Sequence, residues 1–167
     1  MKDPRISTLL AHAVDTGQAN ERWIHVEENL EVQLPGAYKR LINLFGASTW
    51  CDFLHVLSPF DFRLNLQARG KEILDVMREC RKEFPSHYPL PLFPERGGLL
   101  PWAITDNGDT LYFITQCSPD DWPTLIRGPR SPEFEVSFLS PTLLIHHFAL
   151  GLLQSTILPT IRLQPGE

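Results

Sequence analysis

The stretch from Phe93 to Trp122, FPERGGLLPWAITDNGDTLYFITQCSPDDW, constrains the fold more than any other part of the chain. It holds two apolar, β-prone runs, Leu99–Thr105 and Thr110–Thr115, on either side of the turn-forming residues Asp106–Asp109. Two such runs joined around Asn-Gly are the strongest short-range signal for a β-hairpin. The sequence therefore predicts an antiparallel hairpin at the centre of a sheet.

Apolar periodicity predicts the elements on both sides of this hairpin. The expected helices are Ile6–Val14, Glu21–Leu30, one opened by Leu34-Pro35 and stopped by Gly46, Leu66–Phe84, and one that is capped by Ser140-Pro141 and fades near Gln154. Gly17–Asn20 breaks the first from the second. The expected strands are Thr49–Leu57, Thr124–Arg127 and a half-buried strand at Phe134–Phe138. Helices segregated from antiparallel strands define an α+β domain, with a central, mainly antiparallel sheet flanked by helices.

The length and composition predict one domain, residues 1–167. A hydrophobic fraction of 43% and a charged fraction of 21% are typical of globular proteins. No apolar segment has the length of a membrane span, and the N-terminus lacks the apolar region of a signal peptide. The cysteines Cys51, Cys80 and Cys117 lie among apolar neighbours without a CxxC motif, so we expect buried free thiols and a cytoplasmic location.

The charge is acidic and unevenly distributed. The net charge of -5 argues against a nucleic-acid partner, because such proteins normally present a basic face. The segment from Pro101 to Ile126 contains four acidic residues and no basic residue. This pattern is compatible with a basic protein partner.

No motif in the chain specifies catalysis, a metal site or a cofactor. The only adjacent histidines, His146 and His147, point about 100° apart on a predicted helix and would not easily share a metal. Cys51 and His55 fall in a predicted strand, where four residues span about 13 Å. A small hydrolase with a dispersed Cys/His/Asp site stays open as an alternative; it requires a thiol within hydrogen-bond reach of a histidine.

The acidic residues themselves allow two interpretations. Asp106 and Asp109 flank the predicted turn, where aspartate bonds to its own backbone; a functional role of the pair would be a contact with a partner or the acid–base or metal chemistry of paired carboxylates. Asp120 and Asp121 precede Trp122 in a proline-bounded loop. One interpretation is a solvated loop whose tryptophan is buried in the core. The other is a protein-contact site, in which the aromatic ring packs against the partner and the acids attract the partner during association.

The hairpin block resembles the SMI1/KNR4 family, which belongs to the SUKH superfamily of bacterial immunity proteins. The resemblance rests on a Gly-Gly-Leu-Leu segment, an Asn-Gly-Asp turn, an aromatic strand and a Pro-Asp-x-Trp-like loop. A Leu-Pro pair followed by a helical tyrosine also fits. In this chain these features are Gly97–Leu100, Asn107–Asp109, Leu111–Phe113, Pro119–Trp122, Leu34-Pro35 and Tyr38. The likeness spans residues 21–153 in the same order.

The resemblance implies an α+β domain without enzymatic activity or cofactor. It implies a protein-binding module, an immunity protein that binds and neutralises a cognate toxin domain of a bacterial polymorphic toxin system, often a nuclease. Fungal relatives instead imply an intracellular regulator or scaffold. In either case the partner is a protein, not nucleic acid or membrane. The candidate contact face consists of the four acids and the tryptophan named above: Asp106, Asp109, Asp120, Asp121 and Trp122.

Overall fold

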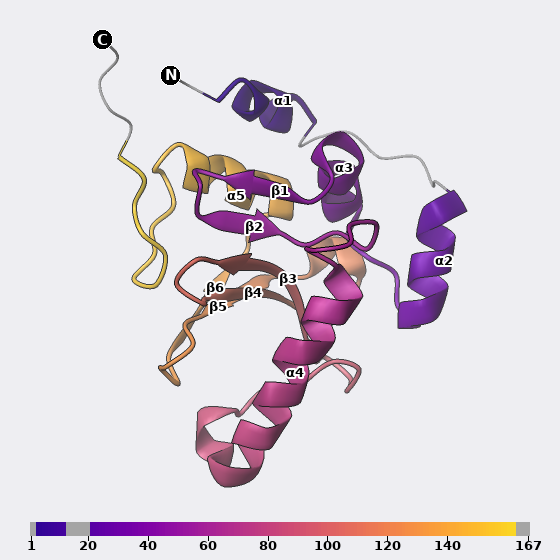
Figure 1. Ribbon diagram of the computed structural model, residues 1–167, viewed down its shortest axis with the longest axis vertical. Helices are drawn as coiled ribbons and strands as arrows, with labels where there is room; N and C mark the ends of the chain where they lie inside the picture. The colour runs from indigo at the N-terminus through magenta and orange to yellow at the C-terminus, as the bar shows by residue number, and fades with distance from the viewer. Residues whose placement is uncertain (1–2, 13–20, 163–167) are drawn as a thin grey trace.

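The computed structural model describes residues 3–12 and 21–162, in which five α-helices surround an open, six-stranded antiparallel sheet (Figure 1). The helices are α1 (Arg5–His12), α2 (Glu21–Leu30), α3 (Gly36–Phe45), α4 (Leu66–Glu83) and α5 (Pro141–Ala149). The strands are β1 (Ser48–Trp50), β2 (Leu54–Val56), β3 (Leu99–Thr105), β4 (Thr110–Ile114), β5 (Thr124–Arg127) and β6 (Phe134–Ser137). Two short 3₁₀ turns, η1 (Pro85–His87) and η2 (Pro119–Asp121), follow α4 and β4.

The sheet is a meander whose strand order equals the chain order. Every neighbouring pair is antiparallel, so the predicted α+β class is confirmed. The predicted hairpin is its centre: β3 and β4 pair from Leu99 with Ile114 to Ile104 with Thr110. A bulge between Pro101 and Ala103 places Trp102 in the core, fully buried and stacked on Phe113.

The predicted single strand Thr49–Leu57 is wrong, because this segment is a hairpin. β1 and β2 pair with each other around a tight turn at Cys51 and Asp52. Both turn residues have positive φ, 54° and 50°, and the Phe53 N–H donates to the Trp50 carbonyl at 3.1 Å. Two consecutive left-handed residues define a type I′ turn, whose usual Asn-Gly signature is missing here.

The helices form where their sequence signals predict. α2, α3 and α4 agree with prediction to within one or two residues. α5 begins where predicted but ends at Ala149, short of the expected end near Gln154, because Gly151 adopts a positive φ of 69°. The break at Gly17–Asn20 lies outside the described residues. The Asn65 side chain caps α4 by accepting from the backbone N–H groups of Gln67 and Ala68. The Ser140 side chain caps α5 by accepting from the Leu143 N–H. Gly46, with φ of 62°, ends α3.

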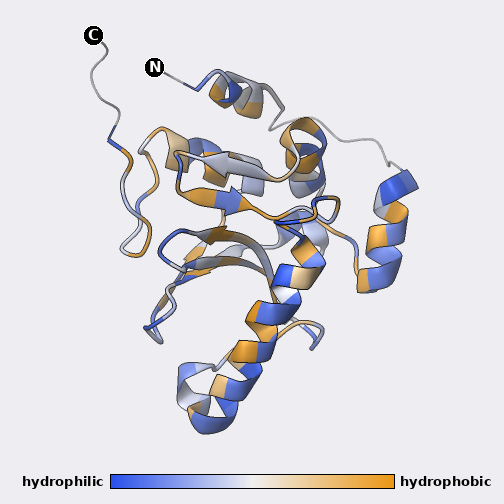
Figure 2. Cartoon of the chain, viewed as in Figure 1, coloured by the Kyte–Doolittle hydropathy of each residue, from blue (hydrophilic) through white to orange (hydrophobic). Residues whose placement is uncertain are grey.

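Two cores lie on opposite faces of the sheet. The larger core joins α1, α2, α3 and α5 to one face, with Tyr38 at its centre donating to the Leu57 carbonyl at 2.5 Å. The smaller core lies under α4 and includes Leu74, Met77 and Tyr112. Figure 2 shows α4 as alternating hydrophobic and hydrophilic bands, because only one side of this helix meets the sheet.

The outermost strand, β6, differs from expectation. Its apolar residues were predicted to be half-buried, but Phe134 and Val136 are 39% and 41% exposed, and Phe138 just beyond the strand is 86% exposed. Pairing with β5 places Phe134 beside Arg127 and Val136 beside Leu125, on the face that α4 covers. α4 packs over β3 and β4, so none of the described helices covers this end of the face.

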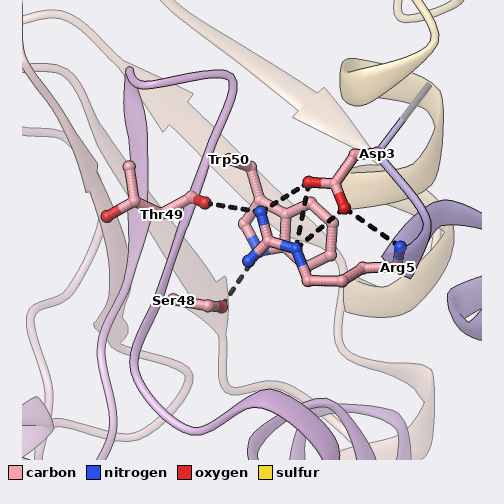
Figure 3. A network of polar contacts seen from close by, with 5 residues as sticks. All are labelled: Asp3, Arg5, Ser48, Thr49 and Trp50. Atoms are coloured by element: carbon pink, nitrogen blue, oxygen red, sulfur yellow. Dashed lines mark hydrogen bonds and ion pairs between the residues drawn. The ribbon is translucent and has the colours of Figure 1, made fainter. Parts of the chain in front are cut away.

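The other edge strand, β1, is held by the N-terminal segment (Figure 3). The Arg5 guanidinium lies 4.2 Å from the Trp50 ring centroid and donates to the Thr49 carbonyl at 3.1 Å. Asp3 pairs with Arg5, and the hydrogen bond from Arg5 holds the pKa of Asp3 below its ordinary value. These contacts fasten the start of α1 to β1 and give one edge carbonyl a partner.

Candidate partner-binding surfaces

The structure separates the candidate acidic residues into two groups. Asp106 and Asp109 lie at the β3–β4 turn, whereas Asp120, Asp121 and Trp122 follow the opposite end of β4. The five residues of β4 lie between the groups, a length of roughly 17 Å at about 3.3 Å per residue. The predicted contact face is therefore not one continuous patch.

Asp109 is part of the turn architecture. It is only 5% exposed, its Oδ2 accepts from the Thr105 hydroxyl at 2.8 Å, and its N–H donates to the Thr105 Oγ1 at 3.1 Å. Such reciprocal bonds satisfy buried polar groups within the turn. Little of Asp109 is left for a partner to touch.

Asp106 is exposed and joins the two hairpins. Its Oδ1 lies 2.7 Å from the Nε2 of His55, and the Nδ1 of the same imidazole lies 2.8 Å from the Thr49 Oγ1. The Asp106 N–H also donates to the Phe53 carbonyl at 3.1 Å. This carboxylate consequently has a partner inside the protein, although it remains accessible from outside.

Trp122 belongs to the core. It is 5% exposed, its ring lies 5.8 Å from that of Phe113, and its Nε1 donates to the Cys117 carbonyl at 3.3 Å. Of the two interpretations of this loop, the buried tryptophan is the one that the structure contains. A contact site here would depend on Asp120 and Asp121, which are both exposed.

Asp120 connects this loop to the start of α3. Its Oδ1 accepts from the Gly36 N–H at 2.8 Å, and Glu27 at the end of α2 accepts from the Leu34 N–H at 2.9 Å. Both negative carboxylates lie near the N-terminal end of α3, where the helix dipole is positive, so their charges are stabilised there. One of these carboxylates comes from the end of α2 and the other from η2. We call the exposed acids at the end of α2 and in η2 the acidic surface: Glu28, Glu31, Asp120 and Asp121.

Two cations lie beside the acidic surface. Lys39 pairs with Glu27 at 2.9 Å, and the Arg40 guanidinium lies near Gly36 next to Asp120. With Glu27 included, five acids face two bases, so the region keeps a net negative charge. The sequence pattern identified Asp120 and Asp121 but missed the α2 acids, because only the fold brings Glu27 and Asp120 to backbone N–H groups two residues apart, those of Leu34 and Gly36.

A groove on the α4 face was not predicted. It lies between α4, the segment after η1 and the β5–β6 end of the sheet, and has a volume of about 310 Å³. Its walls include Ile73, Val76, Met77, Tyr88 and Arg127. The Arg127 guanidinium carbon lies 4.1 Å from the Tyr88 ring centroid, and the Arg127 Nε donates to the Ser131 carbonyl at 3.3 Å.

The phenols of this groove are neutral at physiological pH. Burial raises the pKa of Tyr112 to about 12, and its hydroxyl donates to the Met77 sulfur at 3.2 Å. Burial, and then a hydrogen bond with Cys80, raise the pKa of Tyr88. The guanidinium of Arg127 is thus a fixed positive charge beside neutral phenols, while the α4 wall of the groove also carries the Arg69–Glu72 ion pair.

The expectation of three buried thiols is wrong. Cys51 and Cys117 are exposed and Cys80 is half-buried: Cys51 lies in a tight turn where a strand was expected, Cys117 lies in the loop after β4, and both have positive φ. Although Cys51 is exposed as a residue, partial burial of its thiol, followed by the charges of Asp3 and Asp52, raises the pKa of Cys51, which opposes thiolate formation. Within residues 3–12 and 21–162, no hydrogen bond links a cysteine to a histidine, so the hydrolase alternative gains no support.

Neither the His146–His147 pair nor any other cluster of the described residues forms a candidate metal site. The rings of His146 and His147 lie 5.9 Å apart, and burial, with the neighbouring His147, lowers the pKa of His146. Among the residues that the structure describes, no group of three or more His, Cys, Asp or Glu side chains could hold a metal ion. Nor is any described helix both long enough and apolar enough to cross a membrane.

Comparison of the chain with models of protein families, with curated proteins and with solved structures finds no match. The resemblance to the SMI1/KNR4 family therefore stays a prediction made from the residues themselves.

Proposed function

We propose that this chain is a non-enzymatic protein-binding module that acts in the cytoplasm as an immunity protein. It would bind a cognate bacterial toxin domain, a nuclease being the first class to test, and block its active site by stoichiometric association. The observation that carries this proposal is the acidic surface around the start of α3, formed by exposed carboxylates from α2 and η2.

Charge complementarity gives the acidic surface its role. A nuclease binds phosphates in a basic groove, so its inhibitor benefits from a negative face. Such complementarity mainly raises the rate of association and orients the encounter. Asp120 is anchored to the Gly36 N–H, which presents its carboxylate at a fixed position. Glu28, Glu31 and Asp121 extend the negative charge on either side.

The test uses charge reversal at Glu31 and Asp121. Both side chains are exposed, and neither carries the backbone contact that Asp120 makes. The probe is the protein encoded by the adjoining gene, with its activity disabled, and the measurement is its association rate at low salt. We expect Glu31→Lys combined with Asp121→Lys to lower that rate about tenfold.

The matched control is Glu79→Lys combined with Glu83→Lys on α4. It changes the net charge equally, at exposed positions on a different element. Its association rate should stay close to that of the unchanged chain. Equal effects of the two double variants would reject the acidic surface. No binding to the adjoining gene product would reject the immunity role and favour the regulatory or scaffold role instead.

A further inference from the structure

We propose that the groove between α4, the segment after η1 and the β5–β6 end of the sheet is a second docking site. Its occupant is an apolar segment of a partner protein that carries an aspartate or glutamate side chain for Arg127. This site is separate from the acidic surface, and its partner chemistry is the opposite one. The proposal does not depend on the immunity role.

Arg127 is a buried cation without a carboxylate. It is 8% exposed, and no carboxylate oxygen of the described residues lies within 4 Å of it. All five basic residues of α4 have such partners: Arg69 with Glu72, Lys71 and Arg78 with Asp75, Arg81 with Glu95, and Lys82 with Glu79. A buried charge is costly unless it is paired, so Arg127 differs from the charges around it.

The guanidinium keeps donor groups for an anion. The Tyr88 ring lies against it, 4.1 Å from the guanidinium carbon, and the Ser131 carbonyl accepts from its Nε. The two terminal nitrogens have no hydrogen-bond acceptor among the described residues, while Arg127 lines the groove. A carboxylate fits such a planar pair of donors with two parallel bonds. Because the Tyr88 ring and the Ser131 bond already hold the guanidinium in place, little side-chain freedom would be lost on binding.

The residues around Arg127 favour a carboxylate that belongs to an otherwise apolar segment of the partner. Val76, on the rim of the groove, is 64% exposed, and Ile73 and Met77 form the wall beneath it. On the same face of the sheet, Phe134 is the strand neighbour of Arg127, and Val136 and Phe138 continue the exposed row. The other two charged residues of the lining, Arg69 and Glu72, pair with each other at 2.8 Å. Apolar side chains beside one unpaired cation are typical of a protein contact with a charged anchor.

The structural alternative is that Arg127 only braces the β5–β6 turn through Ser131 and Tyr88. In that case no ligand should depend on the charge in the groove. The alternative therefore predicts that substitutions on the rim of the groove leave all binding unchanged, which separates it from the docking proposal.

The experiment selects random linear dodecapeptides by display on the full chain. We expect the selected peptides to carry an acidic residue beside aliphatic or aromatic residues. Val76→Glu should weaken their binding about tenfold by like-charge repulsion, and Val76→Lys should strengthen it. Because Val76 is exposed, both variants should fold. Replacing the acidic residue of a peptide by its amide should weaken binding to a similar extent.

Two controls keep this result separate from other effects. Ile24→Glu introduces the same charge at an exposed apolar position of α2, whose buried residues belong to the other core, and should change nothing. Glu31→Lys combined with Asp121→Lys should also leave peptide binding intact, so the two proposals can fail independently. The docking proposal is overturned if no peptide is selected, if selected peptides lack acidic residues, or if Val76→Glu binds them as the unchanged chain does.

Discussion

Two hairpins of the same sheet are closed by tight turns of different origin. In the β3–β4 turn, Gly108 supplies the left-handed residue, with φ of 83°, and Asp109 bonds to Thr105. In the β1–β2 turn, Cys51 and Asp52 adopt left-handed φ although neither is glycine or asparagine. The first turn is stabilised by its own residues, whereas the second adopts a conformation that its residues disfavour.

Contacts from outside the segment hold the β1–β2 turn. The Phe53 carbonyl accepts from the Asp106 N–H, and the Phe53 ring stacks on Phe148 of α5 at 6.2 Å. His55 bonds to the Asp106 carboxylate. The comparison shows that local sequence specifies one turn, while the other depends on the neighbouring hairpin and a helix. Three changes would test this difference.

Loss of the Asp109 carboxylate should have the largest effect. Asp109→Ala leaves the buried Thr105 hydroxyl without its acceptor, so we expect the free energy of unfolding to fall by about 2 kcal/mol. Asp109→Asn keeps an acceptor oxygen and should cost clearly less. Urea unfolding of the three proteins measures both values. Similar losses for alanine and asparagine would show that the Thr105 bond does not carry the stability of this turn.

In the β1–β2 turn, a double substitution is expected to raise the free energy of unfolding. Cys51→Asn combined with Asp52→Gly supplies the residues that a type I′ turn prefers, and should raise the free energy of unfolding by about 1 kcal/mol. The matched control is Gly108→Ala, which forces a side chain into a left-handed position 3.3 Å from the Pro129 ring. That variant should lose about 1 kcal/mol. A loss in the first variant would mean that contacts of the Cys51 and Asp52 side chains outweigh their backbone strain.

The same distinction explains which parts of the fold the sequence predicts. The caps Asn65 and Ser140 and the Asn-Gly turn act through neighbouring residues, so helix limits and the central hairpin follow from local patterns. The β1–β2 turn does not, because an apolar, β-prone run conceals it. The exposure of Phe134 and Val136 is equally non-local, since it depends on where α4 crosses the sheet.

The candidate sites also differ in how much of each one the sequence predicts. The acidic run is visible in the sequence, yet its members lie at both ends of β4, and only Asp120 and Asp121 join acids from α2. The isolation of Arg127 could not be predicted at all. An unpaired cation is identified only when the positions of the nearby carboxylates are known, and these come from other elements: Glu72 of α4 lines the same groove, and Asp109 of the β3–β4 turn lies beside Gly128.

The smallest expected effect concerns the link between the hairpins. His55 and Asp106 are partly exposed, so their coupling in a double-mutant cycle should be about 0.5 kcal/mol. The variants are His55→Gln and Asp106→Ala, alone and combined, compared by urea unfolding. The control cycle uses His25 and Glu28 of α2, whose side chains lie 3.9 Å apart and are 82% and 69% exposed, and should give no coupling.

The coupling also reports how the β1–β2 turn is maintained. If His55 and Asp106 couple no more strongly than His25 and Glu28, the left-handed turn is held by the Phe53 carbonyl bond and by packing on Phe148 alone. If they couple as expected, the gain from the Asn-Gly exchange at Cys51 and Asp52 should be larger in the Asp106→Ala background. A turn that has lost an outside support depends more on the preferences of its own residues.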